Sequence, residues 1–201
     1  DLQQYALQKL KDTYTEHEIK VLCSLSFCKL LHYTNIDIHL KKHEFLAKSF
    51  IDKFVQIVEE LKTDKPIQYI LGETEFAGID FQLNSETLIP RPETEELVMW
   101  IVESGVQPGA SVLDIGTGSG CIIVSLVKLL KGVRLCGVDI SPAAVRQAAD
   151  NARRNGVEVK FEVRDILRYE EWEWPGFDVI VSNPPYVRES EKALMHDRVL
   201  N

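Results

Sequence analysis

The sequence of 201 residues has few cysteines, and their spacing is not that of a disulfide framework or a zinc site. The four lie far apart or within predicted regular elements, with no CxxC pair and no histidine at ligand spacing, so we predict reduced thiols and no metal. Long apolar runs are also missing, because the stretch from Cys121 to Leu130 contains Ser125 and Lys128 and is too short to span a bilayer. The sequence does not begin with a basic segment followed by an apolar one, so we expect a cytoplasmic protein, or one of an organellar matrix, without a membrane partner.

An excess of positive charge is lacking as well. The formal net charge is −8, and residues 1–65 contain ten lysines and ten acidic residues, whereas the remainder contains 13 basic and 21 acidic residues. Sequence-independent affinity for nucleic acids comes mainly from Lys and Arg that neutralise phosphates, so we expect no direct nucleic-acid partner. The hydrophobic content of 45% is sufficient for one full domain and a smaller one, and we expect a monomer.

Residues 1–65 are predicted to form a small helical domain. Thr15 to Glu18 has the form of a capping box, and apolar residues follow it at helical spacing. A second amphipathic run places five apolar residues on one stripe: Leu46, Phe50, Phe54, Ile57 and Leu61. We interpret these stripes as the core of a helical bundle and not as a ligand site.

Residues 66–90 are predicted to be a linker with a β-hairpin, because Pro66 breaks the helical pattern and Tyr69 to Leu83 alternates around Ala77 and Gly78. A helix is expected after Pro92, with acidic residues in its first turn. The hairpin would then lead directly into the second domain.

Residues 91–201 are predicted to form an α/β domain with a Rossmann-like, mostly parallel sheet. Short apolar strands are expected at 111–115, 134–140, 159–163 and 177–181, with helices at 121–131 and 142–155. Strands that alternate with helices are typical of βαβ units, whose strands are parallel. The strand at 177–181 has the composition of a central strand, but no strand pattern follows it, so we expect C-terminal strands to be missing from this sequence.

A glycine-rich loop follows the first strand of this domain, in the segment Asp114 to Gly120. Its glycines permit a tight turn and a close approach of a ligand to the backbone, at the point where a helix begins. An NAD-binding loop is the obvious competitor, but its Gly-x-Gly-x-x-Gly spacing is absent. The loop is therefore predicted to bind a nucleotide-type ligand.

Two acidic residues end the next two strands. Asp139 lies about twenty residues beyond the loop, where a carboxylate can accept both ribose hydroxyls of an adenosine-containing ligand. The alternative for Asp139 is a helix cap before Ser141. Asp165 could receive the adenine amino group, or it could be a surface loop residue.

The most specific feature is Ser-Asn-Pro-Pro-Tyr at residues 182–186, directly after the fourth strand. Two prolines remove backbone donors, which leaves carbonyl oxygens and the Asn183 amide oxygen at the carboxyl ends of the strands as acceptors for an NH2 group. An amide or exocyclic amine nitrogen is a poor nucleophile because its lone pair is delocalised. Acceptors that hold both of its hydrogens can orient this lone pair toward a sulfonium methyl group, and Tyr186 would pack against the planar group. The alternative is a proline-rich turn or a peptide ligand motif.

With these residues, the sequence resembles the HemK/PrmC family, the peptide chain release factor N5-glutamine methyltransferases. The resemblance covers nearly the whole chain, through the helical N-terminal domain and five segments: Pro66 to Gly72, Phe76 to Gly78, Leu88 to Glu95, Gly116 to Gly120, and Asn183 to Tyr186. The segment from Ile89 to Glu95 distinguishes this family from other methyltransferases with the same Asn-Pro-Pro-Tyr.

The resemblance implies a class I methyltransferase fold with S-adenosyl-L-methionine as cofactor and S-adenosyl-L-homocysteine as product. It implies these cofactor-binding residues: Gly116, Thr117, Gly118, Ser119, Gly120, Asp139, Asp165, Ile166 and Asn183. The substrate, the glutamine of the Gly-Gly-Gln motif of a class I release factor, would be bound by Asn183, Pro184, Pro185 and Tyr186. Asn183, Pro184 and Tyr186 would be catalytic, and the N-terminal helices would dock the factor.

The resemblance also implies that Arg91 and Glu93 shape the mouth of the active site, although Arg91 could equally pair with nearby acids. Family members continue past Asn201, so activity of a chain that ends there is not expected. We predict direct transfer of the methyl group, with no covalent enzyme intermediate, metal or strong base.

The main alternative is a nucleic-acid amino methyltransferase that acts on adenine N6 or cytosine N4. Such an enzyme would need a basic face and usually base flipping, which an acidic domain does not suggest. A non-catalytic binding module with a vestigial cofactor loop would be favoured by a lack of cofactor binding. A dehydrogenase is the remaining alternative, and Asn-Pro-Pro-Tyr has no role in it.

Overall fold

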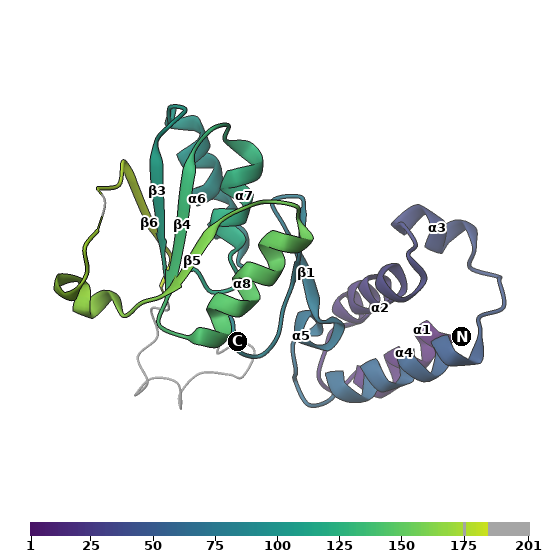
Figure 1. Ribbon diagram of the computed structural model, residues 1–201. Helices are drawn as coiled ribbons and strands as arrows, with labels where there is room; N and C mark the ends of the chain where they lie inside the picture. The colour runs from purple at the N-terminus through teal and green to yellow at the C-terminus, as the bar shows by residue number, and fades with distance from the viewer. Residues whose placement is uncertain (175, 185–201) are drawn as a thin grey trace. The chain divides into compact units, whose positions relative to one another are not determined.

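A computed structural model describes residues 1–174 and 176–184 of the chain (Figure 1). The contacts divide the chain into two compact units, of which the first runs from Asp1 to Leu71 and the second begins at Gly72. None of the helices among the described residues is long and apolar enough to cross a membrane.

The first unit consists of helices, as predicted. They are α1 (Leu2–Leu10), α2 (Glu16–Leu31), α3 (Asn35–Leu40), α4 (Lys48–Leu61) and α5 (Ile67–Leu71). The predicted capping box at the start of α2 is confirmed, because the Thr15 hydroxyl accepts a hydrogen bond from the Glu18 N–H and the Glu18 carboxylate accepts one from the Thr15 N–H. The predicted stripes form the core, in which Phe54 is 1% exposed and stacks on Phe27 with ring centroids 5.0 Å apart.

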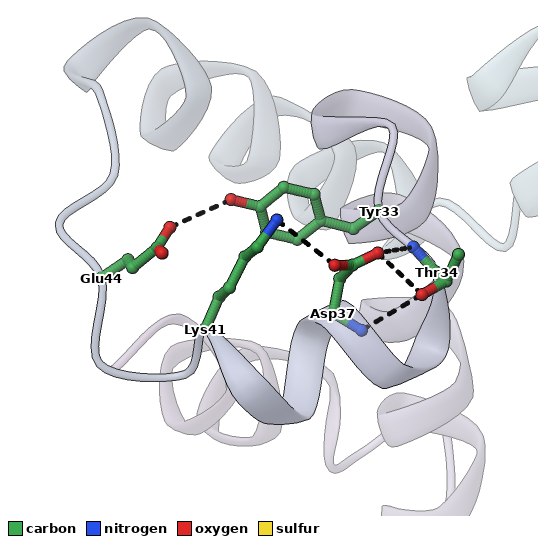
Figure 2. A network of polar contacts seen from close by, with 5 residues as sticks. All are labelled: Tyr33, Thr34, Asp37, Lys41 and Glu44. Carbon is green, nitrogen blue, oxygen red and sulfur yellow. Dashed lines mark hydrogen bonds and ion pairs between the residues drawn. The ribbon is translucent and has the colours of Figure 1, made fainter.

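The short helix α3 is held by polar contacts at its surface (Figure 2). The Thr34 hydroxyl accepts a hydrogen bond from the Asp37 N–H at 3.2 Å, and the Thr34 N–H donates to the Asp37 carboxylate at 2.9 Å. The Thr34 N–H and the Thr34 hydroxyl both donate to the Asp37 carboxylate, and together with the nearby Lys41 they lower the pKa of Asp37 to about 2. The Lys41 ammonium lies 4.1 Å from the centroid of the Tyr33 ring, whose hydroxyl donates to Glu44 at 3.2 Å. Isolated helices of this length are marginal in water, so these contacts and the capping box stabilise α3.

The second unit begins with the predicted hairpin, formed by β1 (Glu73–Phe76) and β2 (Ile79–Gln82), which pair antiparallel. Ala77 and Gly78 both have positive φ, at 50° and 71°, as the tight two-residue turn of a hairpin requires. The prediction that the alternating segment begins at Tyr69 was wrong, because α5 continues to Leu71. Its first turn is set by Pro66, whose carbonyl accepts the N–H of Tyr69 at 3.1 Å, and a proline favours the start of a helix.

A four-stranded parallel sheet confirms the predicted Rossmann-like fold. Its strands are β3 (Ser111–Ile115), β4 (Arg134–Asp139), β5 (Lys160–Val163) and β6 (Val179–Ser182), in the spatial order β5-β4-β3-β6. Its helices are α6 (Pro92–Glu103), α7 (Cys121–Leu129), α8 (Pro142–Arg154) and the 3-10 helix η1 (Ile166–Glu171). The helix α7 contacts both α6 and α8. The crossovers β3-α7-β4 and β4-α8-β5 run in the same direction along the sheet, and right-handed connections place α7 and α8 on the same face.

The register of the sheet brings the predicted site residues to one edge. Ile115 of β3 is paired with Val138 of β4 and with Ser182 of β6, and Asp139 is paired with Val163 of β5. The carboxyl ends of the four strands therefore lie level with one another, at the edge of the sheet where ligands bind in open parallel sheets. At the opposite ends, the Asp178 carboxylate accepts hydrogen bonds from the Ser111 N–H and hydroxyl, both at 2.8 Å, which fixes β6 beside β3.

Candidate functional site

The glycine-rich loop passes directly over the end of β4. The N–H groups of Gly116 and Thr117 both donate to the Val138 carbonyl, at 2.8 and 2.9 Å. Gly116 and Gly118 have φ of 72° and 55°, a region in which other residues are strained. A Cβ at Gly116 would meet no heavy atom within 4 Å, and one at Gly118 would meet only the Gly116 carbonyl oxygen at 3.9 Å. This part of the loop is therefore open to the close approach of a ligand.

Gly120 has a different physical role from the first two glycines. It lies at φ 79°, and a Cβ there would stand 3.0 Å from the Ala148 Cβ and 3.1 Å from the Ala148 Cα. The missing side chain lets the start of α7 pack closely against α8. In this structure Gly120 therefore permits the close packing of α7 on α8. Its predicted role in cofactor binding stays a prediction.

Asp139 lies at the end of β4, beside the loop. Its Oδ2 accepts a hydrogen bond from the Gly118 N–H at 3.0 Å, and its Oδ1 accepts one from the Ser141 N–H at 2.9 Å. An ionised carboxylate has about four acceptor positions, so about two remain for hydroxyl groups. The helix cap of α8 is instead Ser141, whose hydroxyl accepts the Ala144 N–H. The side chain of Asp139 thus orients the loop and retains capacity for a ligand.

Asp165 and Ile166 follow β5 on the same edge of the sheet. The Asp165 carboxylate caps η1, because its Oδ1 accepts the Leu167 N–H at 3.0 Å. Ile166 is the first residue of η1, and both side chains are half-buried. The capping contact uses one oxygen of Asp165, and its predicted contact with adenine stays a prediction.

Asp114 is a site residue that the sequence prediction missed. It is fully buried, and its Oδ2 accepts a hydrogen bond from the Thr117 hydroxyl at 2.6 Å, while Oδ1 has no hydrogen-bond partner among the described residues. Burial raises the pKa of Asp114 to about 7, opposed by the Thr117 hydrogen bond and assisted by the negative charge of Asp139. An acidic residue between the apolar Leu113 and Ile115 of β3 is the sequence signal that could have identified it.

Asn151 is a second residue that the sequence prediction missed, and it joins three segments around the loop. Its Nδ2 donates to the carbonyls of Ser119 and Gln82 at 2.9 and 3.0 Å, and its Oδ1 accepts the Gln82 N–H at 2.8 Å. The side chain is 0% exposed. Asn151 therefore connects α8 to the hairpin strand β2 and to the carbonyl of a loop residue.

Asn183 follows β6, so its segment shares the edge of the sheet with the glycine loop and with Asp139. Its Nδ2 donates a hydrogen bond to the Thr94 hydroxyl at 2.8 Å, and this bond joins it to the first turn of α6. Ser182 anchors the strand end beside the loop, because its hydroxyl donates to the Ile115 carbonyl at 2.8 Å. Pro184 is exposed, and the predicted Pro185 and Tyr186 lie outside the described residues.

Arg91 and Glu93, expected at the mouth of the site, lie at the start of α6. Arg91 is the N-cap residue and Glu93 is in the first turn, where its charge complements the helix dipole; both are exposed. Glu95 of the same turn accepts the Ala77 N–H at 3.0 Å and so connects α6 to the hairpin turn.

These residues suit an adenosine-containing cofactor, because the open glycine backbone permits close approach and the Asp139 carboxylate has spare acceptor capacity. Residues 107–200 match the family model described as a methyltransferase domain. Fold and site define the chain as an S-adenosyl-L-methionine-dependent methyltransferase, which confirms the predicted enzyme class and cofactor.

The particular family follows from the N-terminal unit and from the relatives. Residues 1–72 match the model described as the PrmC N-terminal domain. The release factor glutamine methyltransferase of Flavobacterium psychrophilum is 40% identical over 198 residues, covering 96% of this chain and 69% of the relative. That of Bacteroides thetaiotaomicron is also 40% identical, covering 98% of this chain and 70% of the relative. The chain belongs to the release factor glutamine methyltransferase family, as the sequence resemblance predicted.

Proposed function

We propose that the enzyme methylates the side-chain amide nitrogen N5 of the glutamine in the Gly-Gly-Gln motif of a class I peptide chain release factor. The observation that carries this proposal is the Asn183 side chain, whose NH2 group is held by the Thr94 hydroxyl. The Asn183 Oδ1 is thereby left as an acceptor at the edge of the sheet where the cofactor loop begins. The names of the relatives, which specify a release factor and a glutamine, support the same acceptor.

The chemistry requires orientation more than it requires a strong base. S-adenosyl-L-methionine would supply an electrophilic methyl group, with its sulfur as the leaving group of the S–CH3 bond that breaks. The amide nitrogen forms the new N–C bond and loses one proton, which passes to water. Asn183 Oδ1 and the Pro184 carbonyl would accept hydrogens of the glutamine NH2 group and turn the nitrogen lone pair toward the methyl group. Orientation of this kind contributes up to roughly 7–11 kcal/mol in well-positioned reactions. The glycine loop and Asp139 would hold the cofactor while Asn183 holds the acceptor.

A nucleic-acid amino group would satisfy the same acceptors, so charge decides between the two substrates. The net charge is −8 and residues 66–201 carry the whole of it, which disfavours a phosphate backbone. A protein substrate does not need a basic face, and we propose that the helical N-terminal unit docks the release factor.

The test is mass spectrometry of a class I release factor after incubation with the complete enzyme and S-adenosyl-L-methionine. We expect one added methyl group on the glutamine of Gly-Gly-Gln. An unmodified factor together with methylated DNA would replace the proposal with the nucleic-acid alternative.

The variant Asn183→Ala separates the role of the acceptor group from that of the cofactor site. We expect a fall in kcat of about 10²–10³-fold, the size seen when one preorganised hydrogen-bonding group is removed. Binding of S-adenosyl-L-homocysteine, measured by calorimetry on the same variant, should change little. Turnover near that of the wild type would contradict the role of Asn183.

A further inference from the structure

Thr94 and Asn183 are 89 residues apart in the sequence, yet they form one partly buried contact beside the site, between the buried Thr94 and the exposed Asn183. The Asn183 Nδ2 donates to the Thr94 Oγ1 at 2.8 Å, and Thr94 is only 5% exposed. Thr94 lies in the first turn of α6, where its N–H donates to the Arg91 carbonyl at 2.9 Å. This hydroxyl is therefore carried by a regular backbone and not by a loose surface segment.

An asparagine side chain has two orientations of almost equal shape. The torsion that turns its amide is broad and roughly two-fold, and the carbonyl oxygen and the NH2 group are similar in size but opposite in hydrogen-bonding function. The partners of the amide therefore decide which group faces the substrate. A threonine hydroxyl can accept or donate a hydrogen bond, and in this structure the Thr94 hydroxyl accepts one from the Asn183 NH2 group. If the NH2 group of Asn183 faced the substrate NH2 group, two sets of donors would meet and no acceptor would be present.

We infer that Thr94 is a positioning residue, which holds the NH2 group of Asn183 so that the amide oxygen faces the acceptor nitrogen of the substrate. This inference rests on the proposed function and adds the group that orients its central side chain. Threonine suits this task because its branched side chain has few rotamers in a helix, and α6 fixes the position of its backbone. Thr94 acts through Asn183 and does not itself contact the reacting atoms.

The kinetic test uses Thr94→Val, which keeps the branched shape and removes the hydroxyl, in the complete enzyme with a release factor and S-adenosyl-L-methionine. We expect kcat to fall about 5- to 30-fold, which corresponds to the loss of one hydrogen bond of 1–2 kcal/mol. The KM for the cofactor and the affinity for S-adenosyl-L-homocysteine should stay within about two-fold, because no cofactor contact changes. Thr94→Ser keeps the hydroxyl and should restore most of the lost kcat.

Two controls separate orientation from a general loss of stability. Thr87→Val removes the hydroxyl of another buried threonine, at 5% exposure in the segment between β2 and α6, and should leave kcat near the wild-type value. If Thr94→Val does not fold, Thr94→Ser and Thr94→Ala form the comparison, since both shorten the side chain and only serine keeps the hydroxyl.

A second measurement does not depend on the substrate. In the cofactor-bound enzyme with 15N-labelled asparagine, the Asn183 side-chain N–H that faces Thr94 should exchange slowly with solvent. Thr94→Val should abolish this protection and Thr94→Ser should keep it.

The possible results distinguish the inference from the proposed function. If the wild type methylates the glutamine but Thr94→Val has the same kcat and the same Asn183 resonances, the positioning role is refuted and the proposed function stands. If the wild type does not methylate the glutamine, the proposed function is refuted, and the role assigned to Thr94 falls with it. A loss of kcat in Thr94→Val that Thr94→Ser restores, with loss and recovery of the protected N–H, would support the inference.

Discussion

Alanine substitutions of two glycines in the glycine-rich loop should differ in what they impair: Gly120→Ala mainly the stability of the fold, and Gly118→Ala mainly the binding of the cofactor. Gly120→Ala places a Cβ 3.0 Å from the Ala148 Cβ at a residue with φ 79°. The left-handed backbone costs roughly 1–2 kcal/mol for a residue other than glycine, and overpacking costs typically another 1–3 kcal/mol. We therefore expect Gly120→Ala to lower the free energy of unfolding by about 2–5 kcal/mol.

Gly118→Ala should be milder for the fold and more severe for the ligand. The added Cβ meets only the Gly116 carbonyl oxygen, at 3.9 Å, so the loss of stability should be the backbone strain alone, about 1–2 kcal/mol. The same Cβ would occupy the open side of the loop, where we expect the backbone to receive the cofactor. We expect this variant to lose most of its affinity for S-adenosyl-L-homocysteine.

The assay combines urea unfolding of the cofactor-free protein with calorimetric titration of S-adenosyl-L-homocysteine. Gly156→Ala is a matched control, because Gly156 has φ 64°, lies after α8 and has no heavy atom within 4 Å of an added Cβ. It should lose as much stability as Gly118→Ala and keep full affinity. Unchanged affinity in Gly118→Ala, or an unfolding free energy for Gly120→Ala equal to that of Gly156→Ala, would refute the division of roles.

Two further predictions concern the buried polar residues around the loop. Because burial raises the pKa of Asp114 from its ordinary 3.8 to about 7, its contribution to the stability of the cofactor-free protein is present below pH 4 and is lost as the pH rises to about 7. Between pH 4 and pH 7 the wild type should therefore lose as much as about 4 kcal/mol of unfolding free energy relative to Asp114→Asn, which does not titrate, at 1.36 kcal/mol per pKa unit. A difference between the two proteins that is constant with pH would contradict the shift. Asn151→Ala leaves the Gln82 N–H and the Ser119 carbonyl without their partner, at about 1–3 kcal/mol for each unsatisfied group, while the Gln82 carbonyl keeps the hydrogen bond from Gln147 Nε2 at 3.0 Å. We expect a loss of roughly 2 kcal/mol or more in chemical unfolding, and a loss below 1 kcal/mol would show that water replaces Asn151.

The fold could be predicted closely where the determining interactions are local. The capping box of Thr15 and Glu18, the stripe of α4 and the turn at Ala77 and Gly78 each depend on residues a few positions apart. The segment from Tyr69 to Leu71 was predicted wrongly because two local signals disagree there. Its alternation resembles a strand, whereas Pro66 starts a helix. The helix formed, so the start signal from Pro66 outweighed the alternating pattern.

The candidate site could be predicted in part. The glycine loop, Asp139 and Asn183 follow strand ends, and the carboxyl ends of parallel strands meet at one edge of a sheet. Sequence spacing could therefore identify these residues without showing what each one touches. Asp114 was missed, since its burial and its shifted pKa depend on the packing around β3.

The sequence by itself thus determined the order of the elements and the place of the glycine-rich loop after the first strand of the sheet, because backbone preferences and hydrophobic periodicity act between near neighbours. Only the tertiary structure decided which polar groups meet. The contacts of Asn183 with Thr94 and of Asn151 with Gln82 join residues 89 and 69 positions apart, and no local pattern encodes such a pair. The close packing of Gly120 on Ala148 has the same origin, since it depends on how α7 and α8 pack together.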